Sequence, residues 1–256
     1  MRTILKKQLF WSLIIFLSVF SCKDKAESQS VHDEKSVAVT KTDVSPEFLF
    51  RITDEEVEKG KEKFKILGLN SKPAVNLDYY DFEKIVNKDG KKYAKFFFLL
   101  GADKSLTLGL ALSENDSLQY KNDILYVLSG NKFILSSAEF ETKKKEFDGF
   151  KSILVDTVSK NDPCDVIVYK VEDINNYFKI IKLIESFTGY KIIDLQFDYI
   201  LFKDFIRKDG TQVDYLKNRE SRISFAVKTN FDETTAKKSF PNDIINFYYD
   251  AGDLKP

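Results

Sequence analysis

Beyond its N-terminal segment, the chain carries apolar residues at a spacing of three or four in two places, which predicts two main helices. The first helix is predicted over 54–67, because Thr53-Asp54-Glu55-Glu56 is a capping box and Gly68 follows as a stop signal. The second helix is predicted to begin with Asp173 as its N-cap and to end at Gly189.

Stretches with a period of two, or with continuous apolar residues between turn signals, predict strands. Residues 79–86 and 93–100 are expected to pair as a hairpin, because the turn at 87–90 contains Asp-Gly and so a residue that accepts positive φ. A second hairpin is expected at 129–131. The strand pattern also covers 106–112, 124–128, 132–140, 165–169, 193–201 and 222–228.

Two further segments carry weaker patterns. Residues 141–150 include the run Lys143-Lys144-Lys145 and are expected to form a charged, solvated connection. Residues 243–249 are compatible with either a short helix or an edge strand. Because successive strands follow one another without a helical crossover, they are expected to pair antiparallel. The predicted fold class is therefore α+β, with antiparallel β-meander sheets packed with the two main helices.

One sequence pattern occurs twice at an offset of 120 residues. Six of the 13 positions from Asp78 to Gly90 are identical in the stretch from Asp198 to Gly210. The two predicted helices begin at the same offset, so the pattern is compatible with two similar α+β halves, 47–150 and 151–256. The alternative is a chance match in a chain rich in Lys, Asp, Tyr and Phe.

The N-terminus has the three parts of a secretory signal. Arg2, Lys6 and Lys7 form a basic head, Leu9–Phe20 is a run of 12 residues without a charge, and Ser21-Cys22 ends it. A transmembrane helix needs about 20 apolar residues to cross the hydrocarbon, so this run is short for a membrane span. The sequence therefore predicts export from the cytoplasm.

The motif Val19-Phe20-Ser21-Cys22 resembles the lipobox of bacterial lipoproteins. In that family the signal is cut before the cysteine, whose side chain is lipidated and whose new N-terminus is acylated. The resemblance implies a signal peptide over 1–21, a lipidated Cys22 that opens a flexible tether over 22–46, and a globular domain over 47–256. The alternatives are an ordinary secretory signal with a coincidental cysteine and an uncleaved membrane anchor.

The residue after the cysteine bears on the destination of such a protein. In the lipoprotein family an aspartate at that position is associated with retention in the inner membrane, and this chain has Lys23 there. By that resemblance we expect a lipid anchor in the outer membrane of the cell envelope, facing the periplasm or the cell surface.

The composition of the segment after Cys22 predicts a tether. Residues 23–46 contain nine charged residues and no aromatic residue, so they cannot bury enough apolar surface to fold alone. As a flexible coil they would span about 25–30 Å on average. That reach lifts a domain clear of the lipid headgroups.

Charge and rare residues exclude several classes of function. Without residues 1–21 the chain has 37 Lys+Arg against 40 Asp+Glu, and this small negative charge provides no field for nucleic acid. The single histidine, His32, lies in the tether, which excludes a histidine-based triad or zinc site in the domain. If Cys22 is lipidated, Cys164 has no intramolecular partner, so it is either buried or pairs with another chain. No cofactor or metal is expected.

Carboxylates and aromatic residues are the remaining candidates for a site. Asp194 and Asp198 are expected on one face of a predicted strand. They could act there as an acid/base pair, and the alternative is that they belong to a polar face in contact with solvent. Residues 114–116 and 161–165 group oxygen ligands in loops, where turn formation competes with calcium binding. Two aromatic runs are expected to pack in the core, with ligand or partner binding as the alternative: Phe96-Phe97-Phe98 and Tyr248-Tyr249.

Two classes of function remain. The first is a non-catalytic binding module of the envelope, whose partner is a protein, a glycan or an apolar ligand. The alternative is a carboxylate-dependent envelope hydrolase of the glycosidase type, which needs two carboxyl groups about 5–10 Å apart around the bond that is cut. We expect the first class, because no catalytic motif occurs in the sequence.

Overall fold

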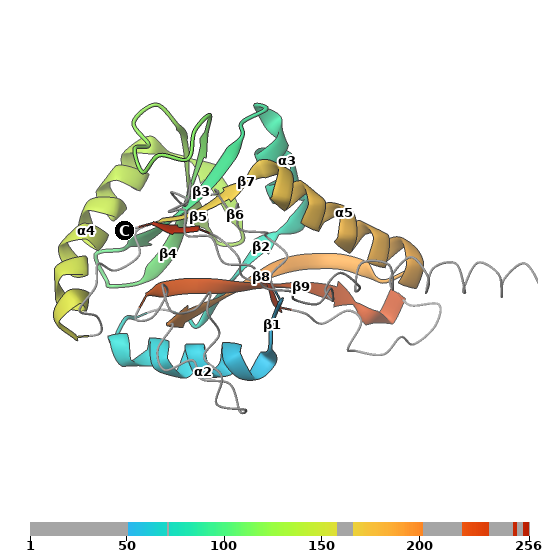
Figure 1. Ribbon diagram of the computed structural model, residues 1–256, viewed down its shortest axis with the longest axis horizontal. Helices are drawn as coiled ribbons and strands as arrows, with labels where there is room; N and C mark the ends of the chain where they lie inside the picture. Colours follow the sequence, from blue (N-terminus) through green and yellow to red (C-terminus); the bar gives the residue numbers. More distant parts are fainter. Residues whose placement is uncertain are drawn as a thin grey trace, which may run out of the picture. The chain divides into compact units, whose positions relative to one another are not determined.

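The computed structural model describes residues 51–70, 72–157, 166–201, 222–235, 248–249 and 253–255. All of these ranges belong to one compact unit, Val44–Pro256. In this part of the chain, four α-helices pack with two antiparallel sheets (Figure 1). The predicted α+β class is confirmed, although two of the helices were not predicted.

The first sheet, sheet A, has five strands in the order β1-β10-β9-β8-β2. Its strands are β1 (Arg51–Ile52), β10 (Tyr248–Tyr249), β9 (Ile223–Asp232), β8 (Lys191–Leu201) and β2 (Ala74–Asp78). The long strands β8 and β9 confirm the predictions for 193–201 and 222–228. β10 places the end of the 243–249 segment in a strand, and residues 243–247 lie outside the described residues.

The second sheet, sheet B, has six strands in the order β11-β7-β3-β4-β5-β6. Its strands are β11 (Asp253–Lys255), β7 (Val166–Lys170), β3 (Tyr93–Leu100), β4 (Leu106–Ser113), β5 (Ile124–Ser129) and β6 (Lys132–Leu135). β3 to β6 form the predicted meander. Gly130 has a φ of +63° in the turn between β5 and β6, as the second predicted hairpin requires.

The prediction of a helix over 54–67 is confirmed. α2 (Asp54–Phe64) continues into a short 3-10 helix, η2 (Lys65–Leu67), and Gly68 ends it with a φ of +62°. The capping box is present, because the Thr53 hydroxyl accepts from the Glu56 N–H at 3.3 Å while the Glu56 carboxylate accepts from the Thr53 N–H at 2.9 Å. Local sequence signals are thus sufficient for this helix.

The second predicted helix, α5 (Val171–Thr188), begins two residues before the expected cap. Asp173 lies in its first turn instead of capping it, and Lys170 at the end of β7 is the N-cap without a side-chain hydrogen bond. The chain passes directly from β7 into α5, so the start of the helix is set by the backbone and not by a capping side chain. Gly189 ends the helix with a φ of +76°, as predicted.

The predicted strand over 79–86 is wrong, because these residues form α3 (Tyr79–Lys88). The Asp78 carboxylate accepts from the Asp81 N–H at 2.9 Å and caps this helix. Tyr79, Phe82 and Val86 follow at helical spacing and are buried. The hairpin with 93–100 therefore does not exist, and β3 pairs with β4 and β7 instead.

The predicted charged connection over 141–150 is also wrong, because it lies within α4 (Ser137–Thr157). The same helix replaces the end of the strand predicted over 132–140, and β6 ends at Leu135. Phe140 and Phe147 lie two turns apart and are fully buried. Lys144 lies between them with its side chain 7% exposed and forms an ion pair with Asp148, so the lysine run is not simply a solvated face.

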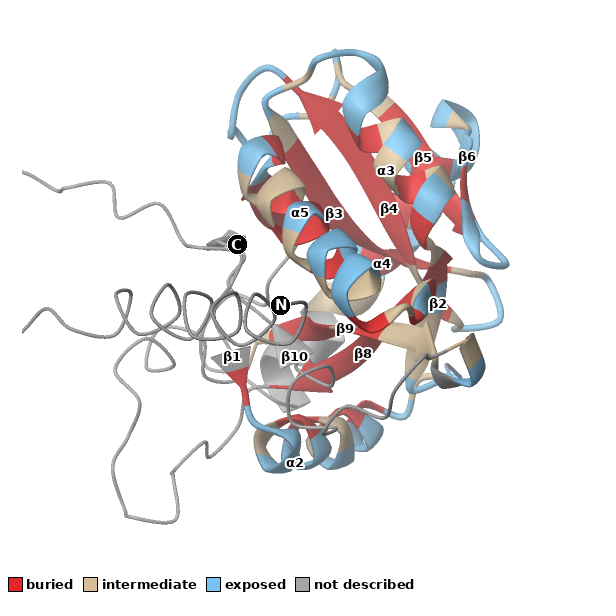
Figure 2. Cartoon of the chain, turned by 90° about the vertical axis from the view of Figure 1, so that its right-hand side faces the viewer, coloured by how far each residue is buried: buried red, intermediate tan, exposed pale blue. Residues whose placement is uncertain are grey.

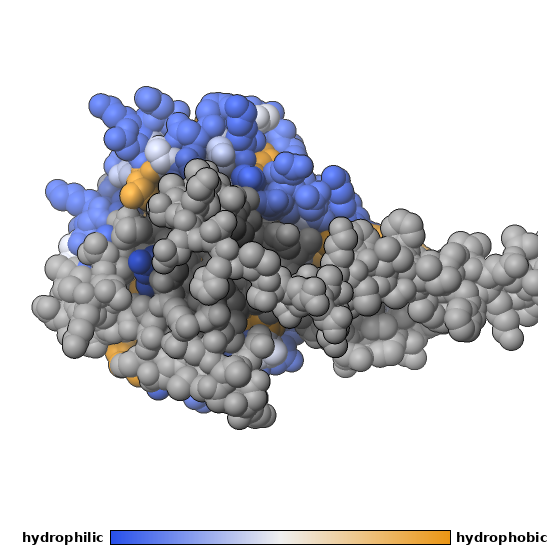
Figure 3. All heavy atoms as spheres, in the orientation of Figure 1, coloured by the Kyte–Doolittle hydropathy of each residue, from blue (hydrophilic) through white to orange (hydrophobic). Residues whose placement is uncertain are grey.

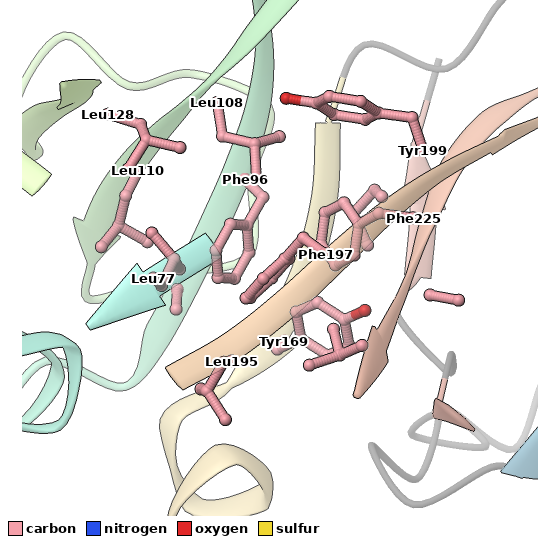
Figure 4. Close-up of a cluster of buried hydrophobic side chains, with 14 of the residues drawn as sticks. Leu77, Phe96, Leu108, Leu110, Leu128, Tyr169, Leu195, Phe197, Tyr199 and Phe225 are labelled. Atoms are coloured by element: carbon pink, nitrogen blue, oxygen red, sulfur yellow. The ribbon is translucent and has the colours of Figure 1, made fainter. Parts of the chain in front are cut away.

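The main core lies between the two sheets and is rich in aromatic rings (Figure 4). The Phe96 ring of β3 packs edge-on against the Phe225 ring of β9 at 5.3 Å between centroids. The Phe197 ring of β8 lies 4.9 Å from the same Phe225 ring. Phe96, Phe97 and Phe98 are all buried, which confirms core packing for that aromatic run.

The repeated sequence does not have a repeated local structure. Asp78 ends a strand and caps α3, whereas Asp198 lies inside β8. Residues 202–210 of the second copy lie outside the described residues. The halves 47–150 and 151–256 also share both sheets, since β2 pairs with β8 and β3 pairs with β7.

Candidate functional site

The outer face of sheet A carries the two predicted carboxylates within a group that we call the polar row. Its members come from α2, β2, β8 and β9: Lys61, Asn76, Asp194, Gln196, Asp198 and Asn230. The strand register places Asn76 opposite Gln196 and Asp194 opposite Asn230. Because side chains alternate along β8, this face is polar while Leu195, Phe197 and Tyr199 are buried in the core.

Asp194 lies in the middle of the three strands and is held from both sides. One carboxylate oxygen accepts from the Asn76 amide of β2 at 3.0 Å, and the other accepts from the Asn230 amide of β9 at 2.7 Å. The same Asn230 nitrogen lies 3.3 Å from the Gln196 side-chain oxygen. These bonds tie three strands together through their side chains.

Asp198 is fully buried on the same face, and α2 packs against its strand, β8 (Figure 1). Its Oδ2 accepts from the Gln196 amide at 2.8 Å, and its Oδ1 lies 3.4 Å from the Lys61 ammonium. Burial alone would lower the pKa of Lys61, but the carboxylates of Glu58 and Asp198 outweigh it and raise that pKa above its usual value. Lys61 is therefore a charged partner for the buried carboxylate.

The polar row is a connected chain of donors and acceptors. Each of the two aspartates accepts hydrogen bonds from side-chain amides, and Asp198 is also paired with Lys61. These donors hold both carboxylates in a fixed position. The arrangement favours a structural polar network over an acid/base pair, because side chains of the protein already occupy both carboxylates, whereas a catalytic pair needs space for substrate between them.

The other predicted oxygen cluster, residues 114–116, is occupied by local contacts. The Glu114 carboxylate pairs with Lys91 at 3.0 Å, and the pair lowers the pKa of that carboxyl. The Asn115 side chain accepts from the Ser117 N–H at 3.1 Å and from its hydroxyl at 2.6 Å. These bonds form a turn, and the described ranges contain no group of His, Cys, Asp and Glu residues suited to a metal ion.

Several predicted residues cannot be placed. Cys22, His32, Cys164 and residues 161–165 lie outside the described residues. For Tyr248 and Tyr249 the structure gives the backbone pairing in β10 only.

A buried ion pair on sheet B was missed by the sequence analysis. Lys95 of β3 is fully buried, and its ammonium donates to Asp123 at 2.8 Å and to the Gln119 carbonyl at 3.0 Å. These bonds from Lys95 hold the loop between β4 and β5 against sheet B. The only sequence signal was a lysine inside an otherwise apolar strand, which is unusual because buried lysine requires a partner.

Exposed apolar side chains were also missed. Figure 3 shows that the described surface in that view is mainly hydrophilic, with small hydrophobic areas. Among the described residues, two neighbours in β6 and two residues one turn apart in α5 are at least half exposed: Ile134 50%, Leu135 64%, Leu183 58% and Phe187 58%. Such side chains are candidates for contact with another molecule.

Comparison of the chain with protein-family models, curated proteins and solved structures gave no match. In the described part of the chain, no helix combines the length and apolar character that crossing a membrane requires.

Proposed function

We propose that this protein is a lipid-anchored protein of the bacterial cell envelope whose domain, 47–256, is a non-catalytic binding module. The observation that carries the proposal is the position of Cys22, where the apolar run of the signal ends and the charged segment begins. The destination that we propose is the outer membrane, and the tether over 22–46 connects the anchor to the domain.

The strength of such an anchor follows from its hydrocarbon content. Each buried CH₂ contributes about 0.8 kcal/mol, so one acyl chain binds reversibly whereas two or three hold a protein stably. A protein with that anchor does not need an exposed membrane-binding surface on its domain. Its exposed side chains are then available for a partner protein or glycan in the envelope.

The geometry of the polar row supports binding over catalysis. Asp194 and Asp198 are the carboxylates that the hydrolase alternative would use, and both are engaged by donors from their own sheet or from α2. The net negative charge after residue 21 gives no reason to propose a nucleic-acid partner.

Metabolic labelling with an alkyne analogue of palmitate tests the anchor. The full chain should incorporate the label and sediment with membranes, whereas Cys22→Ala should do neither. Cys164→Ala is the matched control, because it removes the other cysteine and should label as the parent does. Membrane association of Cys22→Ala equal to that of the parent, or an unmodified N-terminus on the purified parent, would overturn the proposal.

A further inference from the structure

β6 is an edge strand with unusual exposure. Within the described residues it has one ladder neighbour, β5, and Figure 2 shows it at the margin of its sheet. Ile134 is 50% exposed and Leu135 is 64% exposed, although Phe133 beside them is buried. An apolar edge strand is normally covered or charged, because its free backbone groups can pair with another chain.

The direction of the backbone groups in β6 follows from its pairing. The Ser136 N–H donates to the Leu125 carbonyl of β5 at 3.1 Å, so the backbone groups of Ile134, two residues earlier, also face β5. Those of Phe133 and Leu135 then face away from the sheet. The Asn131 carbonyl has the same outward direction and accepts from the Asp78 N–H at 2.8 Å.

The two ends of β6 differ in protection. At the start, Lys132 forms an ion pair with Asp81 of α3, and Asn131 is bonded to β2. At the end, Ile134 and Leu135 are uncharged, and at least half of each side chain is exposed. Edge protection by a lysine is therefore present at one end of the strand only.

We propose that the β6 edge pairs antiparallel with β6 of a second copy of this chain, about a two-fold axis at Ile134. The outward N–H and C=O groups of Phe133 in each copy then form hydrogen bonds with those of Leu135 in the other copy. The two Ile134 side chains become neighbours on one face, and Leu135 lies opposite Phe133 of the second copy on the other face. Sheet B becomes continuous across both copies.

The charges near β6 fit this two-fold arrangement. Lys132 lies opposite Ser136 of the second copy and not opposite another lysine. α3 runs beside β6, since Asp81 pairs with Lys132 and the Phe82 ring lies 6.0 Å from the Phe133 ring.

The two-fold axis also makes the two α3 helices antiparallel. A second copy therefore complements this edge in its backbone and apolar groups, and it places no like charges opposite one another along β6. The inference goes beyond the proposed function and does not require the anchor, although confinement to a membrane would raise the effective concentration.

Disulfide trapping in the full chain tests the pairing geometry. Ile134 would be a non-hydrogen-bonded antiparallel pair with Cα atoms about 4.5 Å apart, within the range of roughly 4.4–6.8 Å for disulfides. In a Cys164→Ala background, Ile134→Cys should form a covalent dimer with copper phenanthroline that dithiothreitol reverses. Leu183→Cys, of similar exposure on α5, is the control and should remain monomeric.

The second measurement is the dimer dissociation constant, obtained by sedimentation in detergent. It is made on the purified full chain and on Cys22→Ala, which removes the anchor. Leu135→Lys should raise the dimer dissociation constant at least about tenfold, because the two-fold axis introduces the charge twice. Leu183→Lys is the matched control and should leave the constant unchanged, and circular dichroism shows whether each variant is folded. The proposal is overturned if the folded parent is a monomer, or if Ile134→Cys cross-links to a different envelope protein and not to itself.

Discussion

The outer faces of the two sheets differ in their chemistry and in the way they are covered. The outer face of sheet B is apolar and packs against Phe140 of α4: Phe97, Leu99, Ala111, Leu125, Val127, Val166 and Val168. The outer face of sheet A carries the polar row and is covered by α2 over Asp198. The outer face of sheet B is thus mainly apolar and contains the buried Lys95–Asp123 pair, whereas the outer face of sheet A carries the polar row beside the buried Ile200 and Ala226.

This difference can be traced to the strand sequences. In β3, Phe96, Phe97 and Phe98 are consecutive and all buried, which requires cover on both faces of the sheet. In β8, apolar residues alternate with Asp194, Gln196 and Asp198, which is the pattern of a sheet with one polar face. Continuous apolar strands therefore indicate a covering helix, and α4 is that helix here.

The largest effect is expected from removing the contact that covers sheet B. Phe140→Ala removes a fully buried ring that packs at 5.3 Å from the Phe97 ring, and it should lower the free energy of unfolding by about 3–5 kcal/mol. Urea denaturation followed by circular dichroism measures the change. Phe187→Ala, on an exposed side chain, should change it by no more than about 0.5 kcal/mol. Equal losses in the two variants would mean that α4 does not cover this face.

A smaller loss is expected where α4 approaches the backbone of β4. A Cβ added at Gly109 would lie 2.5 Å from the Phe140 ring and 2.8 Å from Leu99. Gly109→Ala should therefore cost about 1–3 kcal/mol of the free energy of unfolding.

Gly149→Ala provides the matched control for Gly109→Ala. Gly149 lies within α4, and an added Cβ meets no atom within 4 Å, so the substitution should stabilise the fold by about 0.5–1 kcal/mol. Thermal unfolding of both variants distinguishes the two sites. A neutral Gly109→Ala would contradict the close approach of α4.

The polar face of sheet A should show a charge effect. Asp198→Asn removes the charge that pairs with Lys61 and should lower the free energy of unfolding by about 1–3 kcal/mol. Glu62→Gln, on the exposed surface of α2, is the control and should have little effect. If the two substitutions lower the free energy of unfolding by the same amount, the pair of Asp198 with Lys61 does not stabilise the fold.

The smallest effect concerns pH. The pKa of Lys61 is raised above its ordinary value of 10.5 in the folded protein, so its protonation favours the folded state. That contribution is fully present below the unfolded pKa and is lost as the pH rises through the folded pKa. The stability difference between the parent and Lys61→Met should therefore be constant up to about pH 10 and shrink as the pH rises above about 10.5. A difference that stays constant over this range would argue against the raised pKa.

The sequence by itself determined the elements whose signals are local. The capping box at Thr53 and the stop at Gly68 define α2, and alternation or apolar runs define β3, β4, β5, β8 and β9. The polar side of β8 was also evident from the sequence. Neighbouring residues carry these signals, so no distant contact is needed to interpret them.

The tertiary structure decided what depends on residues far apart in the chain. Residues 79–86 were predicted as a strand, and the Asp78 cap is a local helix signal that this prediction missed. The packing of Tyr79 and Phe82 on α5, which also favours the helix, comes only from the tertiary structure. Asp194 acquires its donors from Asn76, 118 residues away, and Asp198 acquires Lys61 from α2. A carboxylate's role depends on the groups around it, and only the packing of the chain brings those groups together.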